Sequence, residues 1–240
     1  MTNPTAAMLV IGDEILSGRT RDANMYHLAR ELTKIGIDLK EVRVVSDDKD
    51  AIIRAIKSLS ETYVTVITSG GIGPTHDDIT ADCVAAAFDR KIDVREDART
   101  LLAAHYDRQG VALNEARLRM ARIPEGAALI DNPVSVAPGF RLENVHVMAG
   151  VPSVFQAMVA SILPNLTGGA PLMSETWRIF RGEGDIAGPL GTLAADYSGL
   201  SIGSYPFQKD GRYGANIVLR GTDAALIATA LNRLQKLFPH

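Results

Sequence analysis

The sequence predicts an α/β fold: a three-layer α/β/α arrangement with a mainly parallel sheet, followed by a small α+β domain. In residues 8–162, short apolar and β-branched runs alternate with segments whose apolar residues recur at helical spacing. Alternating strands and helices form right-handed crossovers, which place helices on both faces of a parallel sheet. After residue 171 the order changes to βαββα, which is typical of a sheet covered on one side.

The elements of the first domain follow from these patterns in chain order. Strands are expected at residues 8–11, 42–45, 63–67 and 145–148. Helices are expected at residues 22–35, 47–59, 81–88, 95–122 with a break near Gly110, and 154–162. Asp22 and Asp47 are the candidate N-caps of the first two helices, because an Asp side chain there accepts a hydrogen bond from a free N–H group. Gly36 is expected to end the first of them.

A segment rich in Pro, Gly and Asn, residues 164–171, is expected to link two domains. We therefore expect a first domain at residues 1–166 and a second at residues 172–240. In the second domain, strands are expected at residues 177–180, 201–207 and 215–220, and helices at residues 186–197 and 223–238. The turn between the last two strands is expected at Lys209, Asp210 and Gly211.

The composition is that of a soluble globular protein, because 46% of the 240 residues are hydrophobic and 22% are charged. A net charge of −3 and a pI of about 6.0, without a basic stripe, argue against a nucleic-acid partner. The single cysteine, Cys83, excludes an internal disulfide, favours a reducing compartment and is expected to be a buried hydrophobe rather than a nucleophile. No stretch approaches the roughly 18 apolar residues of a membrane span, so we expect a cytoplasmic protein without a membrane partner.

The most informative motif is residues 69–80, Ser-Gly-Gly-Ile-Gly-Pro-Thr-His-Asp-Asp-Ile-Thr, which lies between an expected strand and an expected helix. Glycine lets the backbone approach a ligand closely, and the N–H groups of a first helical turn have no partner within the helix. This order of strand, glycine-rich turn and helix therefore predicts an anion site. His76 is expected to be a solvated loop residue, with a phosphate contact as the alternative.

Asp77 and Asp78 in this segment have two interpretations. Thr75 and Asp78 have the spacing of a capping box, and acids suit the positive end of a helix dipole. Capping does not explain the glycines, however, since Asp47 and Asp50 stand at another helix start with no glycine-rich turn before them. If the acids are functional, a divalent cation such as Mg²⁺ must join them to an anionic ligand. That interpretation makes Asp77 and Asp78 catalytic and metal-binding residues and predicts phosphoryl or nucleotidyl chemistry.

Further candidates lie at the same edge of the predicted sheet, where parallel strands present their carboxyl ends. Gly12 and Asp13 follow the first strand, although the same residue types form ordinary turns. Asn132, taken as exposed, could read a ring edge or a ribose, whereas Pro138 and Gly139 more often form a rigid structural turn.

These motifs together resemble the MoaB/Mog superfamily of molybdopterin-binding domains, and more closely the N-terminal domain of the CinA proteins. The matching segments, in the family's order, are residues 12–18, 22–24, 70–80, 132 with 137–140, and 150–152. The resemblance implies the three-layer fold, a homo-oligomer, and a pocket for a phosphorylated pterin or nucleotide. Residues 201–206 resemble the small second domain of the same relatives.

The relatives divide in function. Mog-type proteins adenylylate molybdopterin, whereas CinA-type domains and the domain fused to some eukaryotic FAD synthases are associated with metal-dependent cleavage of ADP-ribose or FAD. The resemblance implies a pyrophosphatase using Mg²⁺, Co²⁺ or Mn²⁺; molybdopterin binding or adenylylation, or non-catalytic nucleotide binding, is the alternative. It makes Asp77 and Asp78 metal or catalytic acids. It implies the ligand-binding positions Gly12, Asp13, Ser69, Gly70, Gly71, Gly73, Thr75, Asn132, Pro138 and Gly139.

The chain departs from the family pattern in three places. It ends near residue 240, so the amidohydrolase-like C-terminal domain of CinA proteins is expected to be absent. Ala149 stands where the family usually has a proline, and Ser135 stands where many relatives have glycine. Because both positions lie at the expected rim of the pocket, the ligand could differ from that of the relatives.

Overall fold

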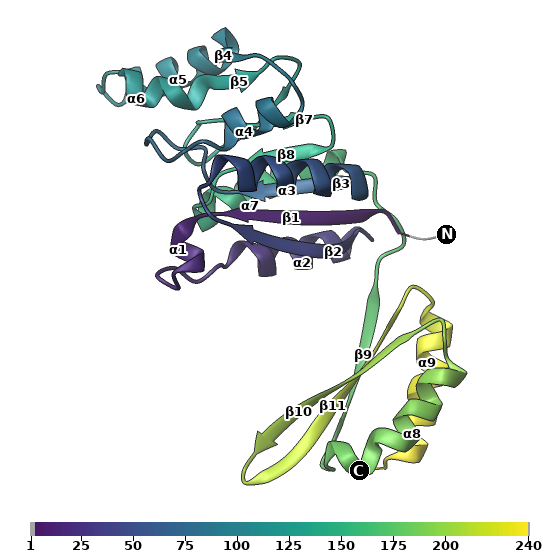
Figure 1. The fold of residues 1–240 in the computed structure, drawn as a ribbon. Coiled ribbons are helices and arrows are strands. Elements are labelled where there is room, and N and C mark those ends of the chain that lie inside the picture. Colours follow the sequence, from purple (N-terminus) through teal and green to yellow (C-terminus); the bar gives the residue numbers. More distant parts are fainter. Residues whose placement is uncertain (1–2, 240) are drawn as a thin grey trace. The chain divides into compact units, whose positions relative to one another are not determined.

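The computed structural model describes residues 3–239. The chain divides between Gly169 and Ala170 into two compact units (Figure 1). The strands of the first unit are β1 (Thr5–Ile11), β2 (Asp38–Val45), β3 (Thr65–Ser69), β4 (Ile92–Val94), β5 (Arg122–Pro124), β6 (Ala128–Ile130), β7 (Gly139–Leu142) and β8 (Val145–Met148). Its helices are α1 (Asp13–Leu16), α2 (Asn24–Lys34), α3 (Lys49–Thr62), α4 (Thr80–Ala87), α5 (Glu96–Arg108), α6 (Glu115–Leu118) and α7 (Pro152–Ile162), with 3₁₀ turns η1 (Arg119–Ala121) and η2 (Leu163–Asn165).

The central sheet of the first unit has six strands in the order β2-β1-β3-β8-β7-β6. Strand β1 is parallel to β2 and β3, and β3 is parallel to β8, whereas β7 is antiparallel to both of its neighbours. The prediction of a mainly parallel sheet is therefore confirmed. The carboxyl ends of β1, β3 and β8 meet at one edge, which is where open α/β sheets bind ligands.

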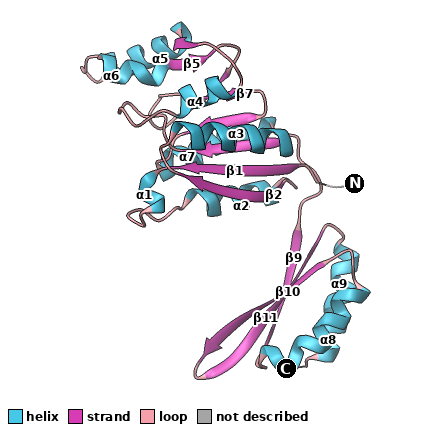
Figure 2. Cartoon of the chain, viewed as in Figure 1, coloured by secondary structure: helices cyan, strands magenta, loops and turns pink. Residues whose placement is uncertain are grey.

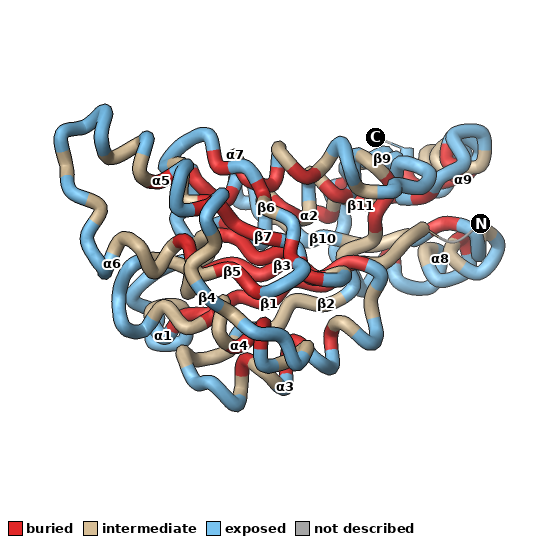
Figure 3. Tube along the Cα trace, turned by 90° about the horizontal axis from the view of Figure 1, so that it is seen from above, coloured by how far each residue is buried: buried red, intermediate tan, exposed pale blue. Residues whose placement is uncertain are grey.

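Alternate side chains of β1 enter two separate cores, one on each face of the sheet. Ala7, Leu9 and Ile11 pack with residues of α3 and α4, whereas Ala6, Met8 and Val10 pack with residues of α2 and α7. Figure 3 shows the buried residues concentrated along the strands between these helical layers. The three-layer prediction is thus confirmed, and the rigid sheet fixes the loops at its edge.

Several of the shortest elements were not predicted, although the four-residue strand β8 was. Strands β4 to β7 have three or four residues each, and α1 has four. A segment of three or four residues often gives too few side chains to show a period of 2.0 or 3.6 residues. The predicted helical region 95–122, by contrast, does break after α5, and Gly110 there has a φ of +66°.

One predicted helix cap is wrong and another is displaced. The side chain of Asp48, rather than Asp47, caps α3 by accepting a 2.8 Å hydrogen bond from the N–H of Ala51. Asp22 accepts a 2.9 Å hydrogen bond from the N–H of Met25, but it lies one residue before the N-cap of α2. Adjacent acids at positions 47 and 48 have the same sequence pattern, so the fold decides which of them caps the helix.

The second unit contains β9 (Met173–Ile179), α8 (Glu183–Asp196), β10 (Ser201–Lys209), β11 (Arg212–Gly221) and α9 (Ala224–Leu237), which is the predicted βαββα order. Its strands form an antiparallel sheet in the order β10-β11-β9. Figure 2 shows α8 and α9 along one side of this sheet. Ala215, Ile217 and Leu219 of β11 are fully buried on that side, so the α+β prediction is confirmed.

In the region that the structure describes, no helix is both long and apolar enough to cross a bilayer.

Candidate functional site

A cleft of about 560 Å³ opens at the carboxyl ends of β1, β3 and β8. The predicted site residues that line it are Gly12, Gly70, Gly71, Gly73, Asp77, Asp78 and Asn132. Its volume falls within the range of small-molecule sites, and its position agrees with the ligand edge of an α/β sheet. The cleft is therefore the candidate functional site.

The glycine-rich loop enters this cleft in a conformation that needs glycine at two positions. Gly70 and Gly71 have φ values of +109° and +70°, in the region that L side chains rarely adopt. A Cβ at Gly70 would collide with the carbonyl oxygen of Ile11, and one at Gly71 with the hydroxyl of Thr80. Thr80 fixes the loop, since its N–H donates to the carbonyl of Gly71 (2.9 Å) and its hydroxyl to that of Gly70 (3.0 Å).

Three consecutive backbone N–H groups beside the cleft have no acceptor. Within the described part of the chain, the N–H groups of Gly71, Ile72 and Gly73 donate to no protein atom, and all three residues are half-buried. Successive free N–H groups in a turn form a concavity that suits an anion. These free groups lie in the loop rather than in the first turn of α4, where the sequence places the N–H groups of the predicted anion site.

Asp78 holds this loop rather than capping α4. Its Oδ2 accepts hydrogen bonds from the N–H (2.8 Å) and the hydroxyl (2.5 Å) of Thr75. Helix α4 begins only at Thr80, with Ile79 as its N-cap, so the capping-box spacing closes a turn before the helix. A Cβ at Gly73 would lie 2.6 Å from Asp78 Oδ2, which shows how closely the carboxylate packs against the loop backbone.

Four carboxylates line the cleft, those of Glu14, Asp47, Asp77 and Asp78. None of the described residues that line it is a lysine or an arginine. Burial and the negative charges of Asp13, Glu14 and Asp77 raise the pKa of Asp47, against the hydrogen bond that its Oδ2 accepts from the N–H of Asp13 (2.9 Å). The cleft is therefore strongly acidic next to a loop that offers free N–H groups.

The pKa of Asp77 shifts in the opposite direction. The nearby Thr75 hydroxyl, although it donates its hydrogen bond to Asp78, and the backbone N–H of Asp77 itself lower the pKa of the Asp77 carboxyl. Asp77 therefore stays ionised under conditions in which Asp47 begins to take up a proton. Two carboxylates in one cleft with opposite pKa shifts can take different chemical roles.

The described residues contain no group of three or more His, Cys, Asp or Glu side chains close enough to hold a metal ion. Such a set is not required for Mg²⁺, which is typically held by one or two carboxylates together with phosphate oxygens and water. Asp77 fits this pattern, because its carboxylate is exposed in the cleft. Asp78 fits it less well, since Thr75 occupies its Oδ2.

Ser69 and Asn132 form internal hydrogen bonds. The Ser69 hydroxyl accepts a 2.8 Å hydrogen bond from Asn24 Nδ2, which also donates to the carbonyl of Gly150 (2.7 Å). Asn132 is 2% exposed, so the expected exposure was wrong. Its Nδ2 donates to the Ser135 hydroxyl (2.7 Å) and to the carbonyl of Ala137 (2.8 Å). Asn24 thus ties β3 to the turn after β8, and Asn132 shapes the loop at the rim of the cleft.

The other predicted positions do not line the cleft. The N–H of Asp13 donates a hydrogen bond to Asp47 Oδ2. The N–H and the hydroxyl of Thr75 both donate to Asp78 Oδ2. Pro138 borders a small adjoining cavity of about 20 Å³. Gly139 belongs to β7, where a Cβ would collide with the carbonyl of Val147 and the side chain of Met158.

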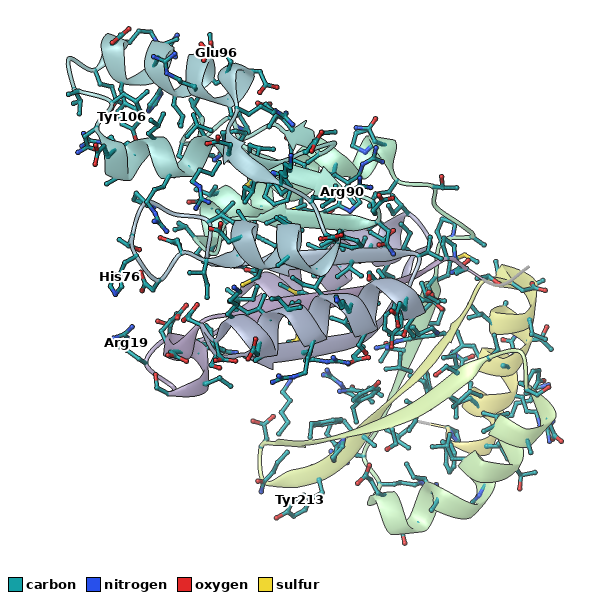
Figure 4. All side chains as sticks on the ribbon, turned by 45° about the horizontal axis from the view of Figure 1, so that its top comes forward. Arg19, His76, Arg90, Glu96, Tyr106 and Tyr213 are labelled. Carbon is teal, nitrogen blue, oxygen red and sulfur yellow. The ribbon has the colours of Figure 1, made fainter. Side chains whose placement is uncertain are left out.

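Two further predictions concern His76 and Cys83. The His76 side chain is 99% exposed, with its Nδ1 3.9 Å from Asp77 Oδ1, and Figure 4 shows it at the outside of the loop. Cys83 is buried in the core between the sheet and α3, and burial raises the pKa of its thiol to about 11. The solvated histidine and the buried cysteine both agree with the expectations from the sequence.

The sequence did not single out Arg119, which lies next to the glycine-rich loop. Its Nη2 donates to the carbonyl oxygen of Asp78 (3.3 Å), and its buried Nε has no partner among the described residues. Arg119 lines the small adjoining cavity together with residues 71–73. No sequence pattern marks it, because α6 and η1 bring it to the loop from 41 residues away.

Two protein families match consecutive parts of the chain. Residues 7–168 match the family described as "Probable molybdopterin binding domain", and residues 171–240 match "FAD synthase, middle domain". The crystal structure of CinA from Thermoplasma acidophilum superposes with a TM-score of 0.62 and is 33% identical in sequence. That match covers 68% of this chain and 97% of the CinA chain.

Two relatives show similarity over different lengths. A Metallosphaera sedula protein is 37% identical over 167 residues, which cover 68% of this chain and 63% of that protein. A Caenorhabditis elegans protein named "Probable FAD synthase" is 32% identical over 258 aligned positions, which cover 97% of this chain and 50% of that protein. The chain thus spans between half and two thirds of the length of these two relatives.

Proposed function

The chain belongs to the family of probable molybdopterin-binding domains, as its resemblance to MoaB/Mog and CinA proteins indicated, and on that premise we propose that its cleft hydrolyses the pyrophosphate bond of a dinucleotide. The substrates are dinucleotides of the class to which ADP-ribose and FAD belong. The reaction depends on a divalent cation, Mg²⁺, Mn²⁺ or Co²⁺. The glycine-rich loop binds the phosphate groups.

The main support for this proposal is that free backbone N–H groups and four carboxylates border the same cleft. The N–H groups of residues 71–73 attract a phosphate, whereas the carboxylates of Glu14, Asp47 and Asp77 repel it. A divalent cation between phosphate and carboxylate removes that conflict. A ligand without phosphate would not account for the free N–H groups, and a phosphate without a cation would be repelled by the carboxylates.

The opposite pKa shifts of Asp47 and Asp77 support separate roles for them. Asp77, whose pKa is lowered, stays ionised and is suited to hold the cation. When bound, the cation polarises a phosphoryl oxygen and offsets the negative charge of the pyrophosphate. Asp47, whose pKa is raised, is suited to accept the proton of the attacking water molecule.

The remaining residues bind and orient the substrate. The N–H groups of residues 71–73 hold the pyrophosphate, and Asp78 keeps the loop in the conformation that exposes them. Arg119 donates to the carbonyl oxygen of Asp78 and lines the small adjoining cavity, so it adds a positive charge next to this loop. Water adds to one phosphorus, the bridging P–O bond breaks, and the products are AMP and a second phosphomonoester.

A second candidate is supported by the family description, which names molybdopterin. A pterin phosphate would meet the same N–H groups, and adenylylation of molybdopterin would require ATP. The match of residues 171–240 to the middle domain of FAD synthase, and the name of the C. elegans relative, favour a dinucleotide instead.

Product analysis by liquid chromatography tests the proposal. The purified protein is incubated with ADP-ribose, FAD, NAD or ATP, with Mg²⁺, Mn²⁺, Co²⁺ or EDTA. We expect AMP from ADP-ribose or FAD only when a divalent cation is present, and loss of that activity in Asp77→Asn. Asp50→Asn is the matched control, because Asp50 is an exposed acid in the first turn of α3. Turnover of ATP with molybdopterin, and of neither dinucleotide, would support the second candidate instead.

A further inference from the structure

The three-stranded sheet of the second unit has one face that its own helices leave uncovered. Residues Ala215, Ile217 and Leu219 of β11 face α8 and α9 and are fully buried. The alternate residues of β11, together with their partners on β9 and β10, point to the other side. We call this other side the open face; it consists of residues 174, 176, 178 and 180, residues 201, 203, 205, 207 and 209, and residues 212, 214, 216, 218 and 220.

The open face combines aromatic and positively charged side chains. Its aromatic residues are Phe180, Tyr205 and Phe207, and its charged residues are Arg178, Lys209, Arg212 and Arg220. None of its described positions is an Asp or a Glu. None of the four cations has an ion pair within the described part of the chain. The face therefore carries four positive charges that form no ion pair, with Asp210 in the turn between Lys209 and Arg212 as the carboxylate next to it in the chain.

The contacts within the open face place the rings and the guanidinium groups together. The guanidinium carbon of Arg212 lies 4.3 Å from the ring centre of Phe180, and that of Arg178 lies 5.0 Å from Phe207. The rings of Phe180 and Phe207 meet edge to face, with their centres 5.5 Å apart. Arg220 lies 6.0 Å from the ring centre of Tyr205, which is 47% exposed. Stacking on a ring leaves the N–H donors of an arginine free for an anion.

We propose that the open face binds single-stranded nucleic acid. Its positive charge complements a phosphate backbone, and its rings and guanidinium planes can stack on unpaired bases. A flat sheet is less suited to a free nucleotide, because small ligands bind in concave sites that bury most of their surface. The nine residues of β10 span roughly 30 Å, enough for several nucleotides.

Binding of nucleic acid at the open face is separate from the proposed hydrolysis in the cleft and does not depend on it. A nucleic-acid partner was not expected from the composition, because the whole chain has a net charge of −3. The pairing of β9, β10 and β11 gathers cations that are distributed over residues 178–220 in the sequence. The net charge of a chain therefore does not determine the charge of one face.

Fluorescence anisotropy of the full chain with a fluorescein-labelled oligo(dT) of about 12 nucleotides tests the proposal at low salt. Arg212→Gln/Arg220→Gln is expected to bind about tenfold more weakly and to reduce the slope of log K against log salt concentration by about 1.4. Tyr205→Leu is expected to bind at least about fivefold more weakly without changing that slope. Circular dichroism establishes that each variant is folded.

The matched control is Arg233→Gln/Lys236→Gln, which removes the same charge from α9, on the other side of the sheet. Affinity within about twofold of the wild type is expected for it. No binding by the wild type, or an equal loss in this control, would overturn the proposal. Equal affinity for a duplex or for an abasic oligonucleotide would also overturn it, because the rings would then have no role.

Discussion

The cleft of the first unit and the open face of the second unit carry opposite charges. Four carboxylates and no lysine or arginine line the cleft, whereas four cations and no carboxylate occupy the open face. We propose phosphate ligands for both. A phosphate in the cleft needs a divalent cation and backbone N–H groups, whereas a phosphate on the open face meets arginine directly. Local charge therefore determines how a phosphate is held in each place, not whether it is held.

The largest expected effect comes from Asp47→Asn, which tests whether the acids of the cleft take part in chemistry. The amide keeps an oxygen for the N–H of Asp13 but cannot accept a proton. We expect kcat for ADP-ribose hydrolysis to fall by about 10²- to 10⁴-fold, with a small change in KM. Steady-state kinetics beside Asp50→Asn measures this. An unchanged kcat would remove Asp47 from the mechanism.

Gly71→Ala tests the geometry of the loop by a comparison between the two units. Alanine there adopts a disfavoured φ of +70° and collides with Thr80, so the N–H groups of the loop move. We expect roughly tenfold weaker phosphate binding and a loss of stability of about 1–3 kcal/mol. Calorimetry measures the loss of stability, and a substrate-binding titration measures the loss of affinity.

Gly211→Ala is the matched control in the turn between β10 and β11. Gly211 has a φ of +74° with nothing within 4 Å of an added Cβ. The backbone strain is similar, so this variant is expected to lose stability but to keep the phosphate affinity of the cleft. Equal losses of affinity in both glycine variants would show that strain alone accounts for the effect.

The pH dependence of hydrolysis sharpens the role of Asp47. Because burial and neighbouring acids raise its pKa, the carboxylate that accepts the proton is lost on the acid side at a higher pH than for an ordinary Asp. We expect kcat/KM to rise with pH through this raised pKa. A profile that stays flat down to the ordinary pKa of aspartate would contradict that role.

The smallest expected effect is on the stability of the metal-free protein. An acid with a raised pKa keeps its proton in the folded protein over a range in which the unfolded chain releases it, so stability falls as the pH rises through that range. Asp47→Asn has no carboxyl at this position, so it avoids this loss of stability. We expect its Tm in EDTA at neutral pH to exceed that of the wild type by about 1–3 °C. A lower Tm would show that the Asp47 carboxylate stabilises the fold.

The sequence predicted the elements that have a clear period and missed those decided by tertiary contacts. The long strands and amphipathic helices, and the βαββα order of the second unit, were predicted correctly. Strands β4 to β7 were too short to show a pattern. The interpretation of Asp47 as a helix cap was wrong, because Asp48 caps α3 and leaves Asp47 free to border the cleft.

The candidate site divides in the same way. The glycine-rich loop with Asp77 and Asp78 was recognised because its residues are contiguous in the sequence. Asp47 and Arg119 belong to distant segments, and only the fold brings them beside that loop. The open face was missed for the same reason, since strand pairing places Arg178, Phe207 and Arg212 together.

Isothermal titration of AMP, the expected product, into the protein with and without Mn²⁺ tests whether a phosphate enters the cleft only together with a cation. Arg212→Gln/Arg220→Gln serves as the background, so that the open face does not contribute. We expect AMP to bind in Mn²⁺, not to bind in EDTA, and to bind much more weakly to Asp77→Asn. Binding of equal affinity in EDTA would contradict this expectation, because a phosphate would then enter the acidic cleft without a cation.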